Sequence, residues 1–207
     1  MIKNLFFDMG GVVFRQNTPE AFRRFRESGI DTDYYMGEHG QKDFFLDVET
    51  GVIDADEFCR RMAVATGRHV TKDEALYCWL GFIKDVPVDR LRFLLELRKN
   101  YHVCLLSNTN PFIMSFTRST RFSADGYPIS HYFDSQFCSY EMGAYKPDAE
   151  FFRIALERDN LVAGESLFID DSIRNVQVAE ALGIKGLHVR QNEDWTEELK
   201  AYLDASR

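Results

Sequence analysis

Two stretches that carry carboxylates follow short apolar runs in this sequence. Asp8 ends the run 2–7 and is followed by two glycines, and the pair Asp170 and Asp171 ends the run 167–169. A short apolar run that stops at an acid or a glycine is typical of a buried strand that ends in a tight turn. Ligand chemistry in an open parallel sheet collects at the carboxyl ends of the strands, so we expect these acids to lie at one edge.

An aspartate at such an edge can attack phosphorus, forming an aspartyl phosphate that water then hydrolyses. The reaction needs a rigid ionised carboxylate, a cation that screens it from the phosphate, and donors for the non-bridging oxygens. Asp8 is the candidate nucleophile. Asp170 and Asp171 are candidate metal ligands, because adjacent carboxylates after an apolar run are costly unless a cation neutralises them. Oxygen ligands of this kind suit Mg²⁺.

Further polar side chains stand beside the other expected strands. Ser107 and Asn108 follow the run 103–106 and can hold a phosphoryl oxygen at the same edge. Lys146, just before a proline, offers a compact positive charge, and Asn175 can face the acids from the next helix. Each feature alone is ordinary: a Ser-Asn pair is usually a turn, Lys-Pro is common on surfaces, and Asp-Asp-Ser often caps a helix. Five such pieces in order, each at a strand end, favour a single phosphate-handling site.

The elements that must position these residues alternate between strands and helices. Strands are expected at 3–7, 102–106, 135–139, 167–169 and 186–189. Helices are expected at 89–100, 147–159, 172–182 and from 196 onward, with Pro147 opening the second and Ser172 and Thr196 capping the last two. This alternation predicts an α/β fold, a parallel sheet with helices on both faces.

Residues 16–86 depart from the alternation, because their pattern is helical and shows no clean strand. Helices are expected from Thr18 and over the segments 42–48, 56–66 and 72–84. About seventy residues exceed an ordinary crossover between strands. We therefore expect an inserted helical cap domain of residues 16–86 above Asp8, and a core domain of residues 1–15 and 87–207. The alternative is that these helices simply cover one face of the sheet.

Composition narrows the class of protein. The 207 residues, 45% of them hydrophobic, suit one generous domain with a smaller insertion. The net charge of −8 argues against nucleic acid or an anionic membrane as the main partner. The four cysteines form no CxxC pair and are expected to be buried reduced thiols, and the five histidines lack ligand spacing. No signal peptide or membrane span is recognised, so a cytoplasmic location is the expectation.

The motifs together resemble those of the haloacid dehalogenase (HAD) superfamily of hydrolases. The matching stretches are Phe7–Val12, Leu106–Asn110, Gly143–Pro147 and Ile169–Ser172 with Asn175. Within the superfamily the chain is similar to the bacterial glucose-1-phosphate phosphatases and to the amino-terminal phosphatase domain of soluble epoxide hydrolases.

That resemblance implies a Rossmann-like core with a helical cap, and a Mg²⁺-dependent phosphatase of a small phosphorylated metabolite such as a sugar phosphate. It implies that Asp8 is the nucleophile and that Asp170 and the carbonyl of Gly10 complete the Mg²⁺ shell. By the same resemblance, Ser107 and Lys146 hold the phosphoryl group. The oligomeric state is left open.

Gly10 departs from the family pattern. Family phosphatases usually carry a second Asp two residues after the nucleophile, as general acid and base, and some carry Asn. Glycine keeps the carbonyl for the metal but cannot exchange a proton. General acid–base help is typically worth ~10²–10⁴-fold, so slow turnover is expected unless another group serves or the leaving group is good.

Two alternative functions remain at this point. One is a dehalogenase or a phosphonate-cleaving relative. Dehalogenases also lack the second acid but need no metal, whereas the pair Asp170–Asp171 argues for one, and no lysine of the insertion is clearly placed for phosphonate cleavage. A degenerate member that binds a phosphometabolite or a protein with little catalysis is the other, and Gly10 supports it. Metal-dependent phosphate release, metal-independent halide release, and binding without turnover distinguish the three.

A few other residues are considered as substrate contacts. Arg15 follows the first motif, and a solvated arginine is the more ordinary explanation. Asp47, Glu49 and Thr50 precede a glycine in the insertion, where a loop can hang over the site. The polar segment 117–130 is expected to be a loop or a short irregular helix, and no function is assigned to it.

Overall fold

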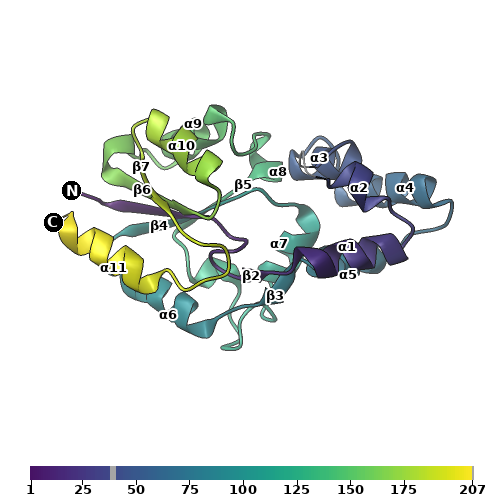
Figure 1. Cartoon of the computed structure of the whole chain (residues 1–207), viewed down its shortest axis with the longest axis horizontal. Coiled ribbons are helices and arrows are strands. Elements are labelled where there is room, and N and C mark those ends of the chain that lie inside the picture. The colour runs from purple at the N-terminus through teal and green to yellow at the C-terminus, as the bar shows by residue number, and fades with distance from the viewer. Residues whose placement is uncertain (38–40, 207) are drawn as a thin grey trace.

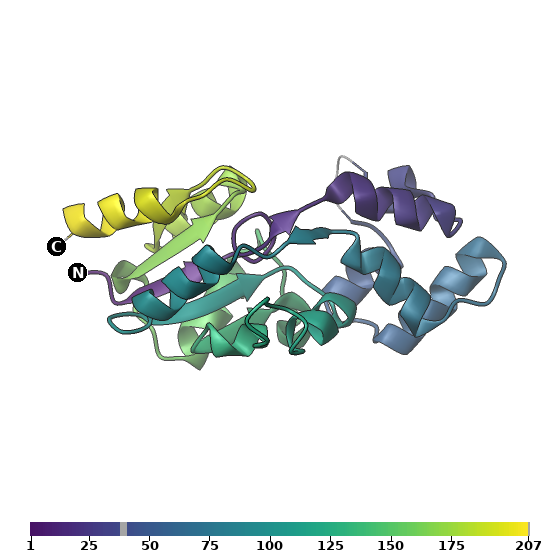
Figure 2. The same ribbon diagram turned by 90° about the horizontal axis from the view of Figure 1, so that it is seen from below.

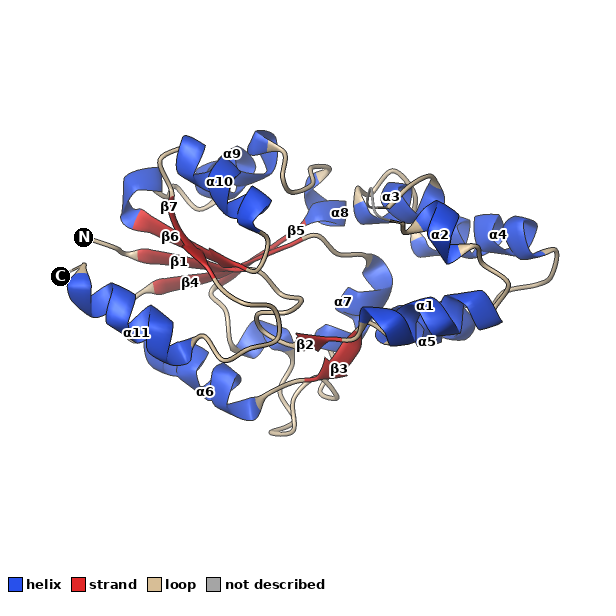
Figure 3. Ribbon diagram, viewed as in Figure 1, coloured by secondary structure: helices blue, strands red, loops and turns tan. Residues whose placement is uncertain are grey.

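A five-stranded parallel sheet forms the centre of the molecule (Figures 1 and 3). The computed structural model describes residues 1–37 and 41–206. The strands lie in the order β5 (Ser135–Cys138), β4 (His102–Ser107), β1 (Asn4–Phe7), β6 (Ser166–Asp170) and β7 (Lys185–His188). All neighbouring pairs are parallel. The sequence prediction of an α/β fold is confirmed.

Two layers of helices cover the sheet because successive strand residues point to opposite faces. On one face Leu5 and Phe7 join a core with α6 (Val88–Leu97) and α11 (Thr196–Ala205). On the other, Phe6 packs in a second core with α9 (Ala149–Arg158) and α10 (Ile173–Ala181). Strands that are buried on both faces have continuous apolar sequences, which is why they could be predicted from the sequence.

The starts of α9 and α11 differ from the expected ones, whereas α10 begins after Ser172 as expected. Pro147 lies outside α9, whose N-cap is Asp148, with the side chain accepting from the Glu150 N–H. Ser172 is the N-cap of α10, but its side chain makes no cap hydrogen bond. Thr196 does not cap α11 either, because the N-cap residue is Trp195. A short polar side chain does not by itself predict a capping hydrogen bond, because neighbouring acids accept from the N–H groups near the helix start. Asp170 accepts from the Ser172 N–H, and Asp194 accepts from the Thr196 N–H.

The chain between β1 and β4 makes a group of helices beyond the carboxyl ends of the strands, on the side away from both termini (Figures 1 and 2). These are α1 (Thr18–Glu27), α2 (Thr32–Tyr35), α3 (Phe44–Glu49), α4 (Ala55–Thr66) and α5 (Lys72–Leu80). Aromatic rings fill the space among them: the Phe25 and Phe45 centroids are 5.1 Å apart, and those of Phe58 and Trp79 5.7 Å.

A short two-stranded sheet was not expected in this part of the chain. The strand β2 (Arg15–Gln16) pairs antiparallel with β3 (Ile83–Asp85), where a helix was predicted to continue to residue 84. The helix stops at Leu80. Two or three residues of strand give no periodicity to recognise, so only their pairing across the chain reveals them.

Two further short helices complete the molecule. They are α7 (Pro111–Thr117), which begins after the N-cap Asn110, and α8 (Ser139–Met142). The segment after α7 consists of turns and a 3₁₀ helix at Ile129–His131, as the sequence suggested. All four cysteines are free and buried. In the described part of the chain, no helix is long and apolar enough to cross a membrane.

Candidate active site

The carboxyl ends of three adjacent strands bring the predicted residues together. Strand β1 lies between β4 and β6, so Asp8, which follows β1, has Ser107 on one side and Asp170 on the other. Ser107 and Asp170 are the last residues of their strands and are almost fully buried. The turn before α9 adds Lys146. Residues 138 and 162 positions apart in the chain therefore form one cluster.

Lys146 lies at the centre of this cluster. Its Nζ donates to Asp8 Oδ1 at 2.6 Å, to Asp170 Oδ2 at 2.8 Å and to the Leu106 carbonyl at 2.9 Å. Burial by itself would lower the pKa of Lys146, but the carboxylates of Asp170 and Asp8 outweigh it and raise that pKa. The side chain is therefore a fixed cation beside the candidate nucleophile.

Three carboxylates crowd the same point, and they fit a divalent cation. One oxygen from each of Asp8, Asp170 and Asp171 lies within 4.8 Å of the others. Burial raises the pKa of Asp8 to about 7 and that of Asp171 to about 6, and repulsion from Asp170 adds to both. A hard cation such as Mg²⁺, which prefers oxygen ligands, would relieve this desolvation and repulsion.

Asp170 is also braced from its own side of the sheet. Asn175 Nδ2 donates to both carboxylate oxygens at 3.1 Å, and the Ser172 N–H donates to Oδ1 at 2.7 Å. Such neighbours fix the orientation of a carboxylate that binds a metal. The sequence analysis placed Asn175 near the acids, and the structure shows this bracing contact.

Ser107 and Asn108 have different surroundings. The Ser107 hydroxyl donates only to the Asn108 carbonyl, at 3.2 Å, among the described residues, and it faces the same cavity as Asp8. The Asn108 side chain is already engaged: Nδ2 donates to the Lys146 carbonyl and Oδ1 accepts from the Lys146 N–H, both at 2.8 Å. This side chain fixes the Lys146 main chain, so it holds the cation in place.

A cavity of about 250 Å³ opens above these groups. Its lining combines the strand ends with the helical group, which contributes Gln41, Glu49, Trp79 and Phe82. Gly10 also lines it, whereas Arg15 does not and instead forms an ion pair with Asp85 at 3.1 Å. The sequence analysis missed Gln41 and the aromatic residues of this wall, because no local motif marks them.

Glu49 is the acid of this upper part. It is 5% exposed and accepts from Gln41 Nε2 at 2.9 Å and from Asn110 Nδ2 at 3.5 Å. Burial raises the pKa of Glu49 to about 7, although hydrogen bonds from Gln41, Asn110 and Tyr145 oppose the rise. The sequence analysis considered Asp47 and Thr50 together with Glu49, but neither of those two lines the cavity.

Three residues that line the cavity carry a polar atom with no hydrogen-bond partner within residues 1–37 and 41–206. Trp79 Nε1, Thr109 Oγ1 and Gln41 Oε1 are buried without a hydrogen bond among the described residues, and all three side chains line the cavity. An unpaired buried polar atom is costly, so a ligand that pairs with it gains affinity. Trp79 Nε1 can only donate a hydrogen bond, Gln41 Oε1 can only accept one, and the Thr109 hydroxyl can do both.

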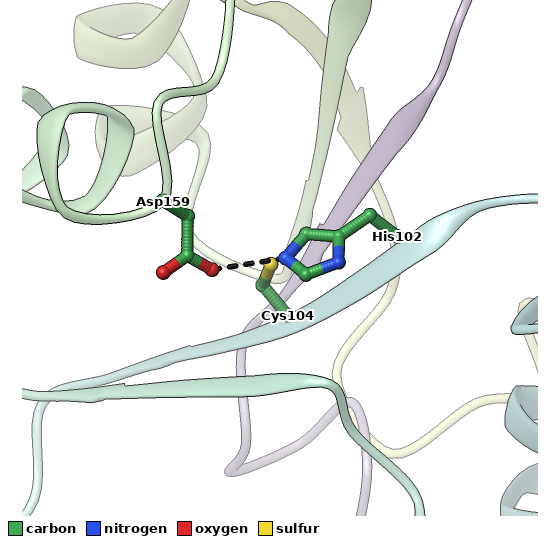
Figure 4. A group of neighbouring side chains, drawn as sticks. All are labelled: His102, Cys104 and Asp159. Atoms are coloured by element: carbon green, nitrogen blue, oxygen red, sulfur yellow. Dashed lines mark hydrogen bonds and ion pairs between the residues drawn. The ribbon is translucent and has the colours of Figure 1, made fainter.

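A second group of metal-binding residue types lies elsewhere in the molecule, and Figure 4 shows it. It consists of His102, Cys104 and Asp159. His102 begins β4, whereas Ser107 ends it, so the group is at the opposite end of that strand from the cavity. His102 Nε2 and Asp159 Oδ2 form a hydrogen bond of 2.9 Å, and burial raises the pKa of the Cys104 thiol. Because His102 and Asp159 already pair with each other, we treat this group as a structural contact.

Comparisons with known proteins agree with this geometry. A family model described as haloacid dehalogenase-like hydrolase matches residues 2–183. A D-ribitol-5-phosphate phosphatase of Bacteroides thetaiotaomicron is 37% identical over 206 residues, which cover 99% of this chain and 100% of that protein.

Solved structures superpose closely as well. A predicted HAD-like family hydrolase from Porphyromonas gingivalis matches with a TM-score of 0.93 and 32% identity, covering 98% of each chain. A mutant HAD family enzyme from Bacteroides thetaiotaomicron, in complex with magnesium and inorganic phosphate, matches with a TM-score of 0.90 and 32% identity. It covers 96% of this chain and 99% of that one.

Proposed function

The chain belongs to the haloacid dehalogenase-like hydrolases, and from that premise we propose that it is a Mg²⁺-dependent phosphatase of a small phosphorylated metabolite. The observation that carries the proposal is the buried cluster of Asp8, Asp170 and Lys146 at the end of the sheet. A nucleophile, a metal-binding carboxylate and a fixed cation within hydrogen-bond distance are the parts that phosphoryl transfer needs.

The reaction proceeds in two steps. An Asp8 carboxylate oxygen attacks phosphorus while the bond from phosphorus to the leaving oxygen breaks, which gives an aspartyl phosphate. Water then attacks that phosphorus, releasing inorganic phosphate and restoring the Asp8 carboxylate. Lys146 and the Ser107 hydroxyl hold the non-bridging oxygens.

Mg²⁺ would be held by Asp8, the Gly10 carbonyl, Asp170 and Asp171, and its charge would screen the nucleophile from the phosphate. The magnesium and phosphate in the related Bacteroides enzyme support this assignment.

The substrate we propose carries several hydroxyls on its organic part, as a sugar or polyol phosphate does. Trp79, Thr109 and Gln41, which line the cavity together with Glu49, each carry a buried polar atom with no hydrogen-bond partner in the described part of the chain. Alcohol groups can donate and accept at the same time, so they suit this mixed set of partners. The similarity to a D-ribitol-5-phosphate phosphatase supports the same class of substrate.

The helical group contributes to this function as a cap. We propose that residues 16–86 form a cap domain over a core of residues 1–15 and 87–207. The support is that the cavity is lined from both sides, by strand ends and by residues of the helical group. We further propose that turnover is slow on substrates with poor leaving groups, because Gly10 cannot supply a proton.

Phosphate release tests this function directly. We would measure it from D-ribitol 5-phosphate, glucose 1-phosphate and an aryl phosphate, with and without Mg²⁺, using Asp8→Asn as the control. Mg²⁺-dependent release that Asp8→Asn abolishes is the expected result. Binding of Mg²⁺ and phosphate with no release would favour a binding protein instead. Metal-independent halide release from a 2-haloacid would favour a dehalogenase.

A further inference from the structure

We infer that Gln16 takes the place of the side chain missing at position 10, and that its amide N–H donates to the leaving-group oxygen. The inference rests on the proposed phosphatase function and concerns the same site. Gln16 comes from β2 and lines the cavity together with Asp8 and Gly10.

The space beside Gly10 is already filled. A Cβ built on Gly10 would lie 2.9 Å from Gln16 Cδ and 3.3 Å from Cγ, and it would be closer still to Nε2. Gly10 is not among the glycines with a positive φ, whereas its neighbour Gly11 has a φ of +82°. The backbone at position 10 therefore suits any residue, and a side chain there would have to displace the Gln16 amide from the place it occupies.

Hydrogen bonds hold the Gln16 amide in this orientation. Its carbonyl oxygen Oε1 accepts from Gln191 Nε2 at 3.0 Å. The Gln16 main chain is clamped by Asn192, whose Oδ1 accepts from the Gln16 N–H at 2.6 Å and whose Nδ2 donates to the Gln16 carbonyl at 3.1 Å. Because Oε1 is engaged, Nε2 is the free end, and it donates to no described residue.

The chemistry of an amide differs from that of the absent carboxylic acid. Nε2–H can stabilise the negative charge that develops on the leaving oxygen as its bond to phosphorus breaks, but it cannot give up a proton. The leaving oxygen takes its proton from solvent water, and the water that attacks the aspartyl phosphate returns a proton in the second step. The rate of the first step should therefore depend more strongly on the stability of the leaving group as an anion than it would in an enzyme with an acid at this position.

Substitutions at Gln16 test the contact. We expect Gln16→Ala to lower kcat/KM for D-ribitol 5-phosphate by about 10²-fold and that for p-nitrophenyl phosphate by less than about threefold, because an aryl oxide needs little stabilisation. Gln16→Met keeps the length of the side chain without the donor, and we expect the same loss. An equal loss on both substrates, or full activity of Gln16→Met, would show that Gln16 only fills space.

A pair of double variants tests the shared position. Gly10→Ala should displace the Gln16 amide and lower activity on D-ribitol 5-phosphate as Gln16→Ala does, and the double variant Gly10→Ala with Gln16→Ala should lower it no further. Gly10→Asp with Gln16→Ala should instead gain activity on D-ribitol 5-phosphate relative to Gln16→Ala alone. If Gly10→Ala is tolerated with Gln16 intact, the inference is wrong. If the phosphatase proposal itself is wrong, the wild-type protein will release no phosphate from either substrate, which distinguishes that outcome from a failure of the Gln16 inference.

Discussion

At the scale of single residues, Lys146 shows how burial and charge define the site. It is 2% exposed and contacts the buried carboxylate of Asp170 and the partly buried carboxylate of Asp8. A single lysine cannot neutralise Asp8, Asp170 and Asp171 together, so the cluster retains excess negative charge. An ammonium ion in an apolar environment is costly unless such partners compensate for it, so the carboxylates of Asp8 and Asp170 stabilise the charge of Lys146.

Glu49 provides a prediction at this scale. Its folded-state pKa of about 7 exceeds the ordinary value of 4.5, so the folded protein holds a proton that the unfolded chain has lost. Its contribution to the free energy of unfolding is complete below pH 4.5 and is lost as the pH rises to about 7. We expect the free energy of unfolding of Glu49→Gln, measured relative to wild type, to rise by about 2.5 kcal/mol between pH 5 and pH 8.

Urea unfolding at the two pH values measures this change. The Glu49→Gln difference cancels the contributions of titrating groups that do not contact Glu49. Tyr145 does contact it, but burial raises the pKa of Tyr145 above its ordinary value of 10, so it does not titrate between pH 5 and pH 8. Asp47→Asn is the matched control, since Asp47 lies on the same helix but is paired with Arg61 near the surface. A Glu49→Gln difference that does not vary with pH would contradict the raised pKa.

At the scale of elements, helix α6 connects two loops beside the site through hydrogen bonds from Arg90. Arg90 is 2% exposed, and its guanidinium donates to the Val12 carbonyl at 2.7 Å and to the Asn192 carbonyl at 2.9 Å. It also donates to the carbonyl of Glu193. One side chain therefore joins the loop after β1 to the loop that clamps Gln16. Burial lowers the pKa of Arg90, but the carbonyls give the guanidinium partners that water would otherwise supply.

Removing the Arg90 guanidinium should destabilise the contact between these two loops. We expect Arg90→Met to lower the free energy of unfolding by about 2–3 kcal/mol, because buried carbonyls lose a charged donor while the apolar stem is kept. Arg92→Met, on the same helix but at the surface, should change it by less than about 0.5 kcal/mol. Urea unfolding of both variants gives the comparison, and equal losses would mean that the buried contacts contribute nothing specific.

At the scale of the whole molecule, a net charge of −8 must be reconciled with binding a phosphate. The helical group adds no lysine or arginine to the cavity lining, where Lys146 is the one cation among the described residues. A dianionic substrate therefore meets too little positive charge from the protein alone. A metal ion bound by the three carboxylates changes that balance, so metal and phosphate should bind cooperatively.

This balance predicts how ligands shift thermal stability. Mg²⁺ with inorganic phosphate should raise Tm by more than the sum of their separate effects, because each stabilises the folded state and favours the other. Asp170→Asn should abolish the Mg²⁺ shift, and EDTA should abolish activity. Asp159→Asn is the control, since it changes the other acid-containing group at the far end of β4. A Mg²⁺ shift that survives Asp170→Asn would place the metal elsewhere.

The sequence by itself determined the sheet, the helices on its two faces, and the family. Buried strands are continuous apolar runs, and Asp8, Ser107 and Asp170 mark their ends, so local pattern was sufficient. The predicted cap at Thr196 was wrong, and Ser172 is the N-cap of α10 but makes no side-chain cap bond, because which acceptor an N–H finds depends on neighbours that the pattern does not weigh.

Only the tertiary structure decided how the site is finished. Gln16 and Gln191 are 175 residues apart in the chain, yet their contact places the Gln16 amide beside Gly10. The cavity wall of Gln41, Glu49 and Trp79 depends likewise on how the helical group packs over the strand ends. Such contacts arise from packing between distant segments, where each residue alone is ordinary, so no local signal in the sequence could reveal them.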